Sequence, residues 1–197
     1  MTASNVQTPF DERELAESIL ARMAADVSMI VDREISIEGV QVERHTQRPA
    51  GKGRVHISFK LSFELDGEVW QGCLLVPLPD AITLAAYMMM LPDESVRGER
   101  ERTELDGPFK EALLEVGKFL AGACDSVLRR ALSEGCSTRS EGCQGVRADV
   151  RPALAYREGQ PLLVARARAR VHDFEPSEVI LVLPSFEDVA AAESPSA

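Results

Sequence analysis

One side of a predicted helix carries a row of ionisable side chains whose spacing suits either chemistry or docking. Residues 106–132 place apolar side chains at helical spacing, which predicts a long amphipathic helix with one buried stripe. Steps of three and four residues align a second set along the other side: Glu111, Glu115, Lys118, Gly122, Asp125 and Arg129. Gly122 leaves a gap in that charged row and costs about 1 kcal/mol of helix stability relative to alanine. The row is therefore either an ordinary solvated surface or a surface to which another macromolecule docks.

The familiar patterns of catalytic and metal-binding residues are absent from the sequence. It has no GxxxxGK(S/T) phosphate loop, no GxGxxG turn, no HExxH helix and no GxSxG elbow. No CxxC pair occurs and the histidines lack metal-ligand spacing, so we predict no metal site and no cofactor. In a reducing compartment we expect free thiols, with a disulfide between Cys136 and Cys143 as the alternative.

The composition is that of a globular protein with an acidic surface. The chain has 197 residues and a formal net charge of −10, which fits one folded domain with a sizeable core. An acidic surface gains nothing by meeting nucleic acid or an anionic membrane, so neither is an expected partner. No apolar run approaches the roughly 20 residues that span a bilayer, and the polar N-terminus lacks a signal-peptide core. We therefore expect a cytoplasmic protein with a single domain at residues 11–185, between disordered tails at residues 1–10 and 186–197.

Hydrophobic periodicity predicts the elements that position the long helix. The expected helices are residues 11–33, 81–91 and 106–132. The expected strands are residues 36–44, 54–65, 70–78, 146–156, 161–172 and 179–184. Hairpin turns are expected at Asp66-Gly67 and at residues 157–160, and loops at residues 93–106 and 133–145. An antiparallel sheet packed with a long helix and two further helices belongs to the α+β class.

A second charged pattern lies on the expected strand 161–172. Arg166, Arg168 and Arg170 share one face of this strand, because successive side chains point to opposite faces. The first interpretation is a sheet edge whose arginines extend into water and block aggregation. The alternative is a site for an anion or an acidic partner, because three guanidinium groups on one face form a fixed positive ridge.

The charged row of the long helix resembles a known signature. Glu111, Glu115 and Lys118, with three and two residues between them and Ala-Gly following, are similar to the signature helix of the CheC, CheX and FliY phosphatases of bacterial chemotaxis. The family pattern is Asp or Ser, three residues, Glu, two residues and Asn, within a run like EIGNxxAG. A single copy of the pattern makes the chain resemble CheX more than the two-site CheC. The resemblance extends to the strand and short helix before the long helix and implies a CheX/CheC-like α+β domain.

The resemblance also implies roles for these residues. In that family the acidic residue engages the invariant lysine of a response-regulator receiver domain, and the asparagine orients the water that attacks the phosphoaspartate. Glu115 matches the acidic position, Lys118 occupies the asparagine position, and Glu111 replaces Asp or Ser. An ammonium group donates hydrogen bonds but accepts none, so Lys118 cannot orient a water as an amide does. Three interpretations stay open: an ion pair in an inactive site, a group that enters the receiver's acidic pocket without hydrolysis, and a donor to the phosphoryl oxygens that still speeds hydrolysis.

The predicted function is that of a signalling protein that binds a receiver domain, or another signalling partner, without phosphatase activity. The binding residues would be Glu111, Glu115, Lys118 and Gly122. The alternatives are an active phosphoaspartate phosphatase with altered chemistry, a structural component of a motor-switch-like assembly, and a charged helix on an unrelated α+β fold. The resemblance and the expected strand edges also suggest a homodimer. Any Mg²⁺ in the phosphatase reaction would belong to the partner's receiver domain.

Overall fold

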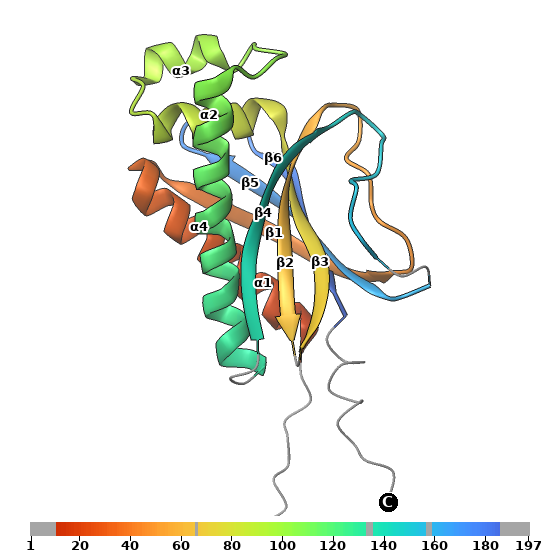
Figure 1. The fold of residues 1–197 in the computed structure, drawn as a ribbon. Coiled ribbons are helices and arrows are strands. Elements are labelled where there is room, and N and C mark those ends of the chain that lie inside the picture. The colour runs from red at the N-terminus through yellow and green to blue at the C-terminus, as the bar shows by residue number, and fades with distance from the viewer. Residues whose placement is uncertain (1–10, 66, 133–135, 157–158, 186–197) are drawn as a thin grey trace, which may run out of the picture.

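Among the described residues, six antiparallel strands form one sheet in the order β1-β5-β6-β3-β2-β4 (Figure 1). The computed structural model describes residues 11–65, 67–132, 136–156 and 159–185. The strands are β1 (Ile35–His45), β2 (His56–Leu65), β3 (Glu68–Pro77), β4 (Cys136–Val146), β5 (Leu162–Val171) and β6 (Ser177–Pro184). The helices are α1 (Glu12–Val31), α2 (Leu78–Met88), α3 (Asp93–Glu99) and α4 (Gly107–Leu132). The predicted α+β class is therefore confirmed, with α3 as an additional helix.

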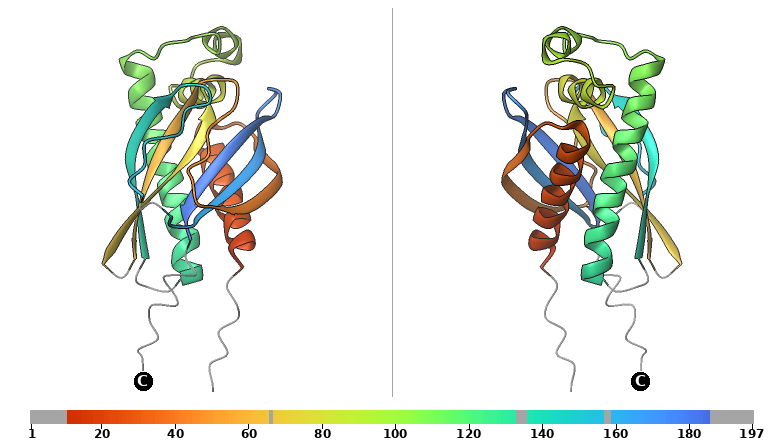
Figure 2. Two further views of the ribbon diagram at one scale, coloured as in Figure 1. Left: turned by 90° about the vertical axis from the view of Figure 1, so that its right-hand side faces the viewer. Right: turned by 90° about the vertical axis from the view of Figure 1, so that its left-hand side faces the viewer.

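The two long helices lie side by side on one face of the sheet (Figure 2). α1 packs beside β1 and α4 packs beside β4, and the main core fills the space between the sheet and the helices. On the opposite face, which we call the outer face, a smaller apolar cluster includes Cys73, Leu75 and Leu154. None of the described helices combines the length and apolarity needed to cross a bilayer. The expected tails, residues 1–10 and 186–197, lie outside the described residues.

The long helix forms where the sequence predicted it. The Asp106 carboxylate caps the first turn by accepting a hydrogen bond from the Phe109 N–H at 3.2 Å. Pro108 is well placed in the first turn, because an N–H at this position would have no acceptor within the helix and proline lacks that N–H. Arg129 and Arg130 lie in the last turn, where cations are stabilised by the helix dipole. The buried stripe includes Leu113 and Leu128, so burial holds the helix in one orientation.

The expectation of a loop over residues 93–106 is wrong for its first half. α3 begins directly after Pro92 and buries Val96, while the remaining residues of the helix are charged or small. The Arg100 Nη2 donates to Asp80 Oδ1 of α2 at 2.8 Å, which ties the end of α3 to its neighbour. A helix of seven residues with one buried side chain has no detectable periodicity, because its stability comes from tertiary contacts.

The expectations of a loop at 133–145 and a strand at 146–156 are also wrong. The strand is β4, which pairs with β2 at the edge of the sheet, and residues 147–156 form no strand. β4 contains small and polar residues, and its pairing is set by β2 and α4 rather than by local propensity. In the segment that follows, Asp149 has a positive φ of 60° and Pro152 cannot donate to a ladder, so the alternation of apolar residues there was misleading.

β5 is an interior strand, so the expectation of a sheet edge at its arginines is wrong. It pairs with β1 on one side and with β6 on the other. Arg166, Arg168 and Arg170 point to the outer face, and the Arg166 Nη1 forms an ion pair with Glu178 Oε2 at 2.8 Å. Alternating apolar and polar residues show that one face of a strand is buried. Edge strands and interior strands of an antiparallel sheet both have this pattern. The sequence therefore could not distinguish between the two.

All four cysteines are free thiols, and burial raises the pKa of three of them. It raises the pKa of Cys73 to about 12, and it also raises the pKa values of Cys124 and Cys143. Cys136 and Cys143 form no disulfide, although both belong to β4.

Raising the pH from 8 to 10 is expected to destabilise the protein through these thiols. In the unfolded chain they ionise near pH 9, whereas native Cys73 keeps its proton until about pH 12, so the unfolded state binds fewer protons in this window. Each such thiol lowers the free energy of unfolding by about 1.4 kcal/mol per pH unit above 9. Urea unfolding at pH 8 and pH 10 measures the loss. The Cys73→Ala variant should lose less, and an equal loss in both proteins would contradict this origin.

Candidate functional site

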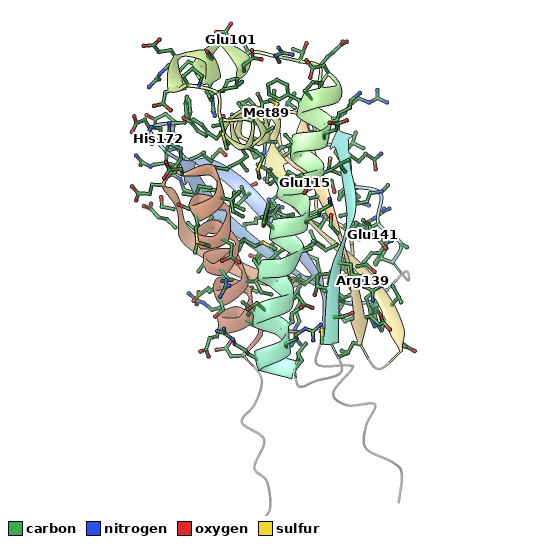
Figure 3. The ribbon with its side chains drawn as sticks, turned by 60° about the vertical axis from the view of Figure 1, so that its left-hand side comes forward. Met89, Glu101, Glu115, Arg139, Glu141 and His172 are labelled. Atoms are coloured by element: carbon green, nitrogen blue, oxygen red, sulfur yellow. The ribbon has the colours of Figure 1, made fainter. Side chains whose placement is uncertain are left out.

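The four residues predicted to form a docking site lie on the exposed side of α4. Glu111, Glu115, Lys118 and Gly122 are all exposed, and Glu115 is on the solvent side of the helix in Figure 3. The structure therefore brings the whole predicted set together on one surface, which we call the α4 row. Nothing lies within 4 Å of the position where a Cβ on Gly122 would stand, so the row has an open gap at this residue.

Glu115 and Lys118 form an ion pair within this row. The Lys118 Nζ donates to Glu115 Oε1 at 2.6 Å, and the side chains of Lys118 and Glu115 are 64% and 52% exposed. An exposed pair at i, i+3 contributes only a few tenths of a kcal/mol because water and salt screen both charges. The pair holds the ammonium beside the carboxylate at low cost, so a partner can separate the two groups easily.

A hollow of about 650 Å³ lies beside the N-terminal half of the α4 row. Its polar side is lined by Glu111, Glu115 and Lys118, and its other walls come from α2, α4 and β4. Those further lining residues are Met88, Met89, Pro108, Ala112, Leu114, Ser140 and Gly142. Three of the four residues of the row therefore line one wall of a concavity, and Gly122 lies outside its lining.

Several residues of this hollow were missed in the sequence analysis. Leu114, which lines the hollow, is 42% exposed, and Phe119, which does not line it, is 38% exposed, so α4 presents apolar side chains next to its charged residues. The exposure of Leu114 could have been predicted from the sequence, because Leu114 lies one helical turn before Lys118 and outside the buried stripe. Met89 and Ser140 carried no such signal, because they reach the site from distant parts of the chain. Flexible methionines suit a surface that adapts to a partner.

The position of α4 over the sheet depends on a second glycine in the same helix. Gly117 is buried, and a Cβ there would stand 3.1 Å from Ser140 Oγ and 3.4 Å from the Phe59 ring. A larger residue would push the helix away from β2 and β4 and would widen the hollow. Gly117 thus fixes the distance between the α4 row and the β4 wall.

The hollow offers charge and apolar surface but no amide side chain. Among its described lining residues none is Asn or Gln, so the structure does not replace the missing amide from another element. Ser140 supplies a hydroxyl, and its Oγ accepts the Gly142 N–H at 3.3 Å. In the described part of the chain, no group of three or more His, Cys, Asp or Glu side chains is arranged to hold a metal ion. The hollow therefore presents two carboxylates, one ammonium and one hydroxyl beside apolar side chains.

Comparison with known proteins gives similarity at the level of fold. No protein-family model and no curated protein sequence matches the chain. The structure of Thermotoga maritima FliY matches with a TM-score of 0.68 at 19% identity, covering 95% of this chain and 96% of that one. The FliM middle domain from H. pylori matches with a TM-score of 0.62 at 12% identity, covering 91% and 94%.

A CheX protein from Desulfovibrio desulfuricans also shares the fold. It matches with a TM-score of 0.53 at 11% identity, covering 86% of this chain and 97% of that one. A chain of the FliG–FliM complex from H. pylori matches with a TM-score of 0.59 at 12% identity, covering 87% and 90%. The fold expected from the signature helix is therefore confirmed: the chain is built like the FliY and CheX structures, and the FliM middle domain shares the same fold.

Proposed function

We propose that this chain is a non-catalytic docking protein of the chemotaxis type. It binds a response-regulator receiver domain through the α4 row of Glu111, Glu115, Lys118 and Gly122. The observation that supports the proposal is the exposed row at the wall of a hollow of about 650 Å³, on a fold shared with FliY and CheX. The partner's receiver domain would carry the Mg²⁺, and this chain would contribute side chains only.

The chemistry of Lys118 supports binding without hydrolysis. Its ammonium is exposed and paired with Glu115, and it accepts no hydrogen bond from a water. The active site of a receiver domain is acidic, so a lysine at this position gains charge-assisted hydrogen bonds there. The same group cannot orient a water in line with the phosphorus, which is the positioning that hydrolysis requires. The row thus favours capture of the regulator over turnover.

The test is the decay of a phosphorylated receiver domain with wild-type protein and with Lys118→Asn. Wild type at substoichiometric amounts should leave the half-life unchanged, and Lys118→Asn should shorten it by roughly tenfold because an amide is restored to the positioning role. The decay is followed on a panel of receiver domains from the same organism. The matched control is Lys118→Gln, which adds an amide on a side chain one methylene longer and should act more weakly.

Two outcomes would contradict this proposal. Faster decay of the phosphorylated receiver domain with substoichiometric wild-type protein would identify this chain as an active phosphatase with altered chemistry. If no receiver binds and neither protein changes any decay, the α4 row has another use. In that case only the fold is shared with the chemotaxis phosphatases.

A second candidate function is a structural part of a motor-switch-like assembly. The observation that favours it is the similarity to FliY and to the FliM middle domain, both with higher TM-scores than the CheX structure. One matching structure is a complex of FliG with FliM, so a FliG-type protein is the partner to try. A stable complex that ignores phosphorylation and survives changes in the α4 row would favour this candidate.

A homodimer in the cytoplasm belongs to the same proposal. β1 and β4 end the described sheet, and each has an edge that no described strand pairs. Such edges are available for pairing with a second chain. Charged side chains and register shifts in both edge strands restrict which partner edge fits.

A further inference from the structure

Two loops on the outer face of the sheet are fastened to each other. They are residues 46–55 and 147–156, and together we call them the loop pair (Figures 1 and 2). The Asp149 N–H donates to Gly51 O at 2.9 Å, and the Tyr156 hydroxyl donates to Thr46 O at 2.7 Å. The Arg48 Nη1 donates to the Pro152 carbonyl at 2.8 Å. These bonds along both loops make the pair one connected surface.

The loop pair is basic in an acidic protein. Its five basic residues are Arg48, Lys52, Arg54, Arg147 and Arg151. Asp149 is its one acidic residue, so the pair has a net charge of +4 while the chain as a whole has −10. The remaining residues therefore carry −14, and the sign of the charge reverses on this part of the surface. A local positive patch of this kind attracts a partner with negative charge.

Three of the five cations of the loop pair have no carboxylate partner within the described part of the chain, whereas Arg48 and Arg151 bind oxygens of the loops themselves. Many arginines elsewhere in the described chain form ion pairs with carboxylates, as in Arg129–Asp125 at 2.7 Å and Arg22–Asp26 at 2.8 Å. Lys52, Arg54 and Arg147 are exposed, and within the described part of the chain none of them is within ion-pair distance of a carboxylate. Their charge is consequently available to a second molecule.

Apolar surface lies between and beside these cations. Val55 is 38% exposed and Val150 is 48% exposed, one in each loop. At the far end of the second loop, a depression of about 320 Å³ on the outer face is lined by Tyr156 and Val69, with further walls from β3, β5 and β6. The Arg48 guanidinium lies 5.6 Å from the centre of the Tyr156 ring, so a cation stands at the rim of this depression. The patch therefore combines charge with places for aliphatic side chains.

We propose that the loop pair is a docking site for an acidic segment of another protein. Carboxylates of that segment pair with the exposed cations, and one of its aliphatic or aromatic side chains enters the depression beside Val69 and Tyr156. Arginine suits this role because its planar fork binds a carboxylate through two hydrogen bonds. A phosphate backbone offers no apolar group that could pack against the exposed valines. The −14 charge of the remaining residues repels an extended polyanion or an anionic membrane.

This inference goes beyond the proposed function because it uses the opposite face of the sheet from α4. Arg168 and Arg170 point to the same outer face, where β5 has Leu162 and Val164 in the apolar cluster. In the register of the sheet Arg168 lies opposite Glu38 of β1 and Glu178 of β6, so these arginines stand in a part of the outer face with mixed charge and are not counted in the loop pair. A protein with partners on two opposite faces links them without any chemistry of its own.

The test uses a fluorescently labelled peptide of twelve residues, in which a central Leu-Val pair is flanked by glutamates. Fluorescence anisotropy measures its binding to the protein. Wild-type protein should bind it with an affinity that falls steeply as salt rises, because several ion pairs form. Arg54→Glu/Arg147→Glu should weaken binding at least tenfold. The matched control is Lys110→Glu/Arg130→Glu, which reverses two exposed cations on α4 and should change the affinity less than twofold. A peptide with Ser-Ser in place of Leu-Val should bind several-fold more weakly.

Three results would overturn this inference. The first is equal peptide affinity in wild type and Arg54→Glu/Arg147→Glu, or no peptide binding at all. The second is tighter binding of a DNA duplex or of phosphatidylserine vesicles than of the peptide. The third is a change in oligomeric state on charge reversal without peptide binding, which would make a second copy of this chain the occupant. Receiver binding is measured on the same variants. Because the reversed residues lie outside the α4 row, failure of the loop-pair inference leaves receiver binding unchanged and is distinguished from failure of the α4 proposal.

Discussion

Gly122→Arg is expected to lower the affinity for a receiver domain by about 100-fold or more, because it fills the gap in the α4 row with a long charged side chain. The free protein accommodates the change, since nothing lies within 4 Å of the new Cβ. Arginine also forms helix better than glycine, so stability should rise by about 0.5–1 kcal/mol. Isothermal titration calorimetry with a receiver domain measures the affinity, and thermal unfolding confirms that the variant is folded.

The control for this change is Gly122→Ala. It gives the same gain in helix propensity but adds only a methyl group, so it should keep receiver binding within a few-fold of wild type. Glu115→Arg reverses a charge in the same row and should lower the affinity as well. If Gly122→Arg and Glu115→Arg both bind like wild type, the row is a bystander and the docking surface lies elsewhere.

Gly72→Val is expected to destabilise the protein by about 3 kcal/mol or more, because β3 passes close to its neighbours at this residue. A Cβ on Gly72 would stand 2.2 Å from the Val182 carbonyl oxygen and 2.8 Å from the Phe63 ring. The first contact is with backbone, so β3 and β6 would have to separate near the centre of the sheet. Urea unfolding followed by circular dichroism measures the loss of free energy.

A matched change at another glycine shows whether this loss depends on space. Gly98→Ala, in α3, adds a Cβ that meets nothing within 4 Å and should leave stability unchanged or slightly raised. If Gly72→Val unfolds at the wild-type urea concentration, the close approach of β3 to β6 is not a constraint in solution.

The sequence predicted the α4 row well because its residues are neighbours on one regular helix. The period of 3.6 residues determines which side chains share a face, so Glu111, Glu115 and Lys118 could be grouped before the structure was known. The same reasoning applied to Leu114 would have shown that α4 also exposes apolar surface. Residues within one helix are thus within reach of sequence analysis.

The rest of the site could not be predicted because it depends on contacts between distant elements. Met89 follows α2 and Ser140 belongs to β4, and the hollow exists only once both are packed against α4. β4 itself escaped prediction because its small, polar residues lack alternation and its pairing partner is β2, far away in the sequence. The loop pair escaped for a similar reason: its two halves lie about 100 residues apart and meet only across the folded sheet.

The position of β6 in the sheet has a consequence for how the chain reaches its native state. β6 is the last strand in the described part of the chain, yet it lies between β5 and β3 and joins the β1–β5 pair to the β3–β2–β4 group. Until β6 has been synthesised, the β1–β5 pair and the β3–β2–β4 group have no strand to join them. Their closure requires contacts of long sequence separation, which slow folding and leave unpaired edges exposed in the meantime. We therefore expect the insertion of β6 between β5 and β3 to be the slow step of refolding and the step that depends most on chaperones.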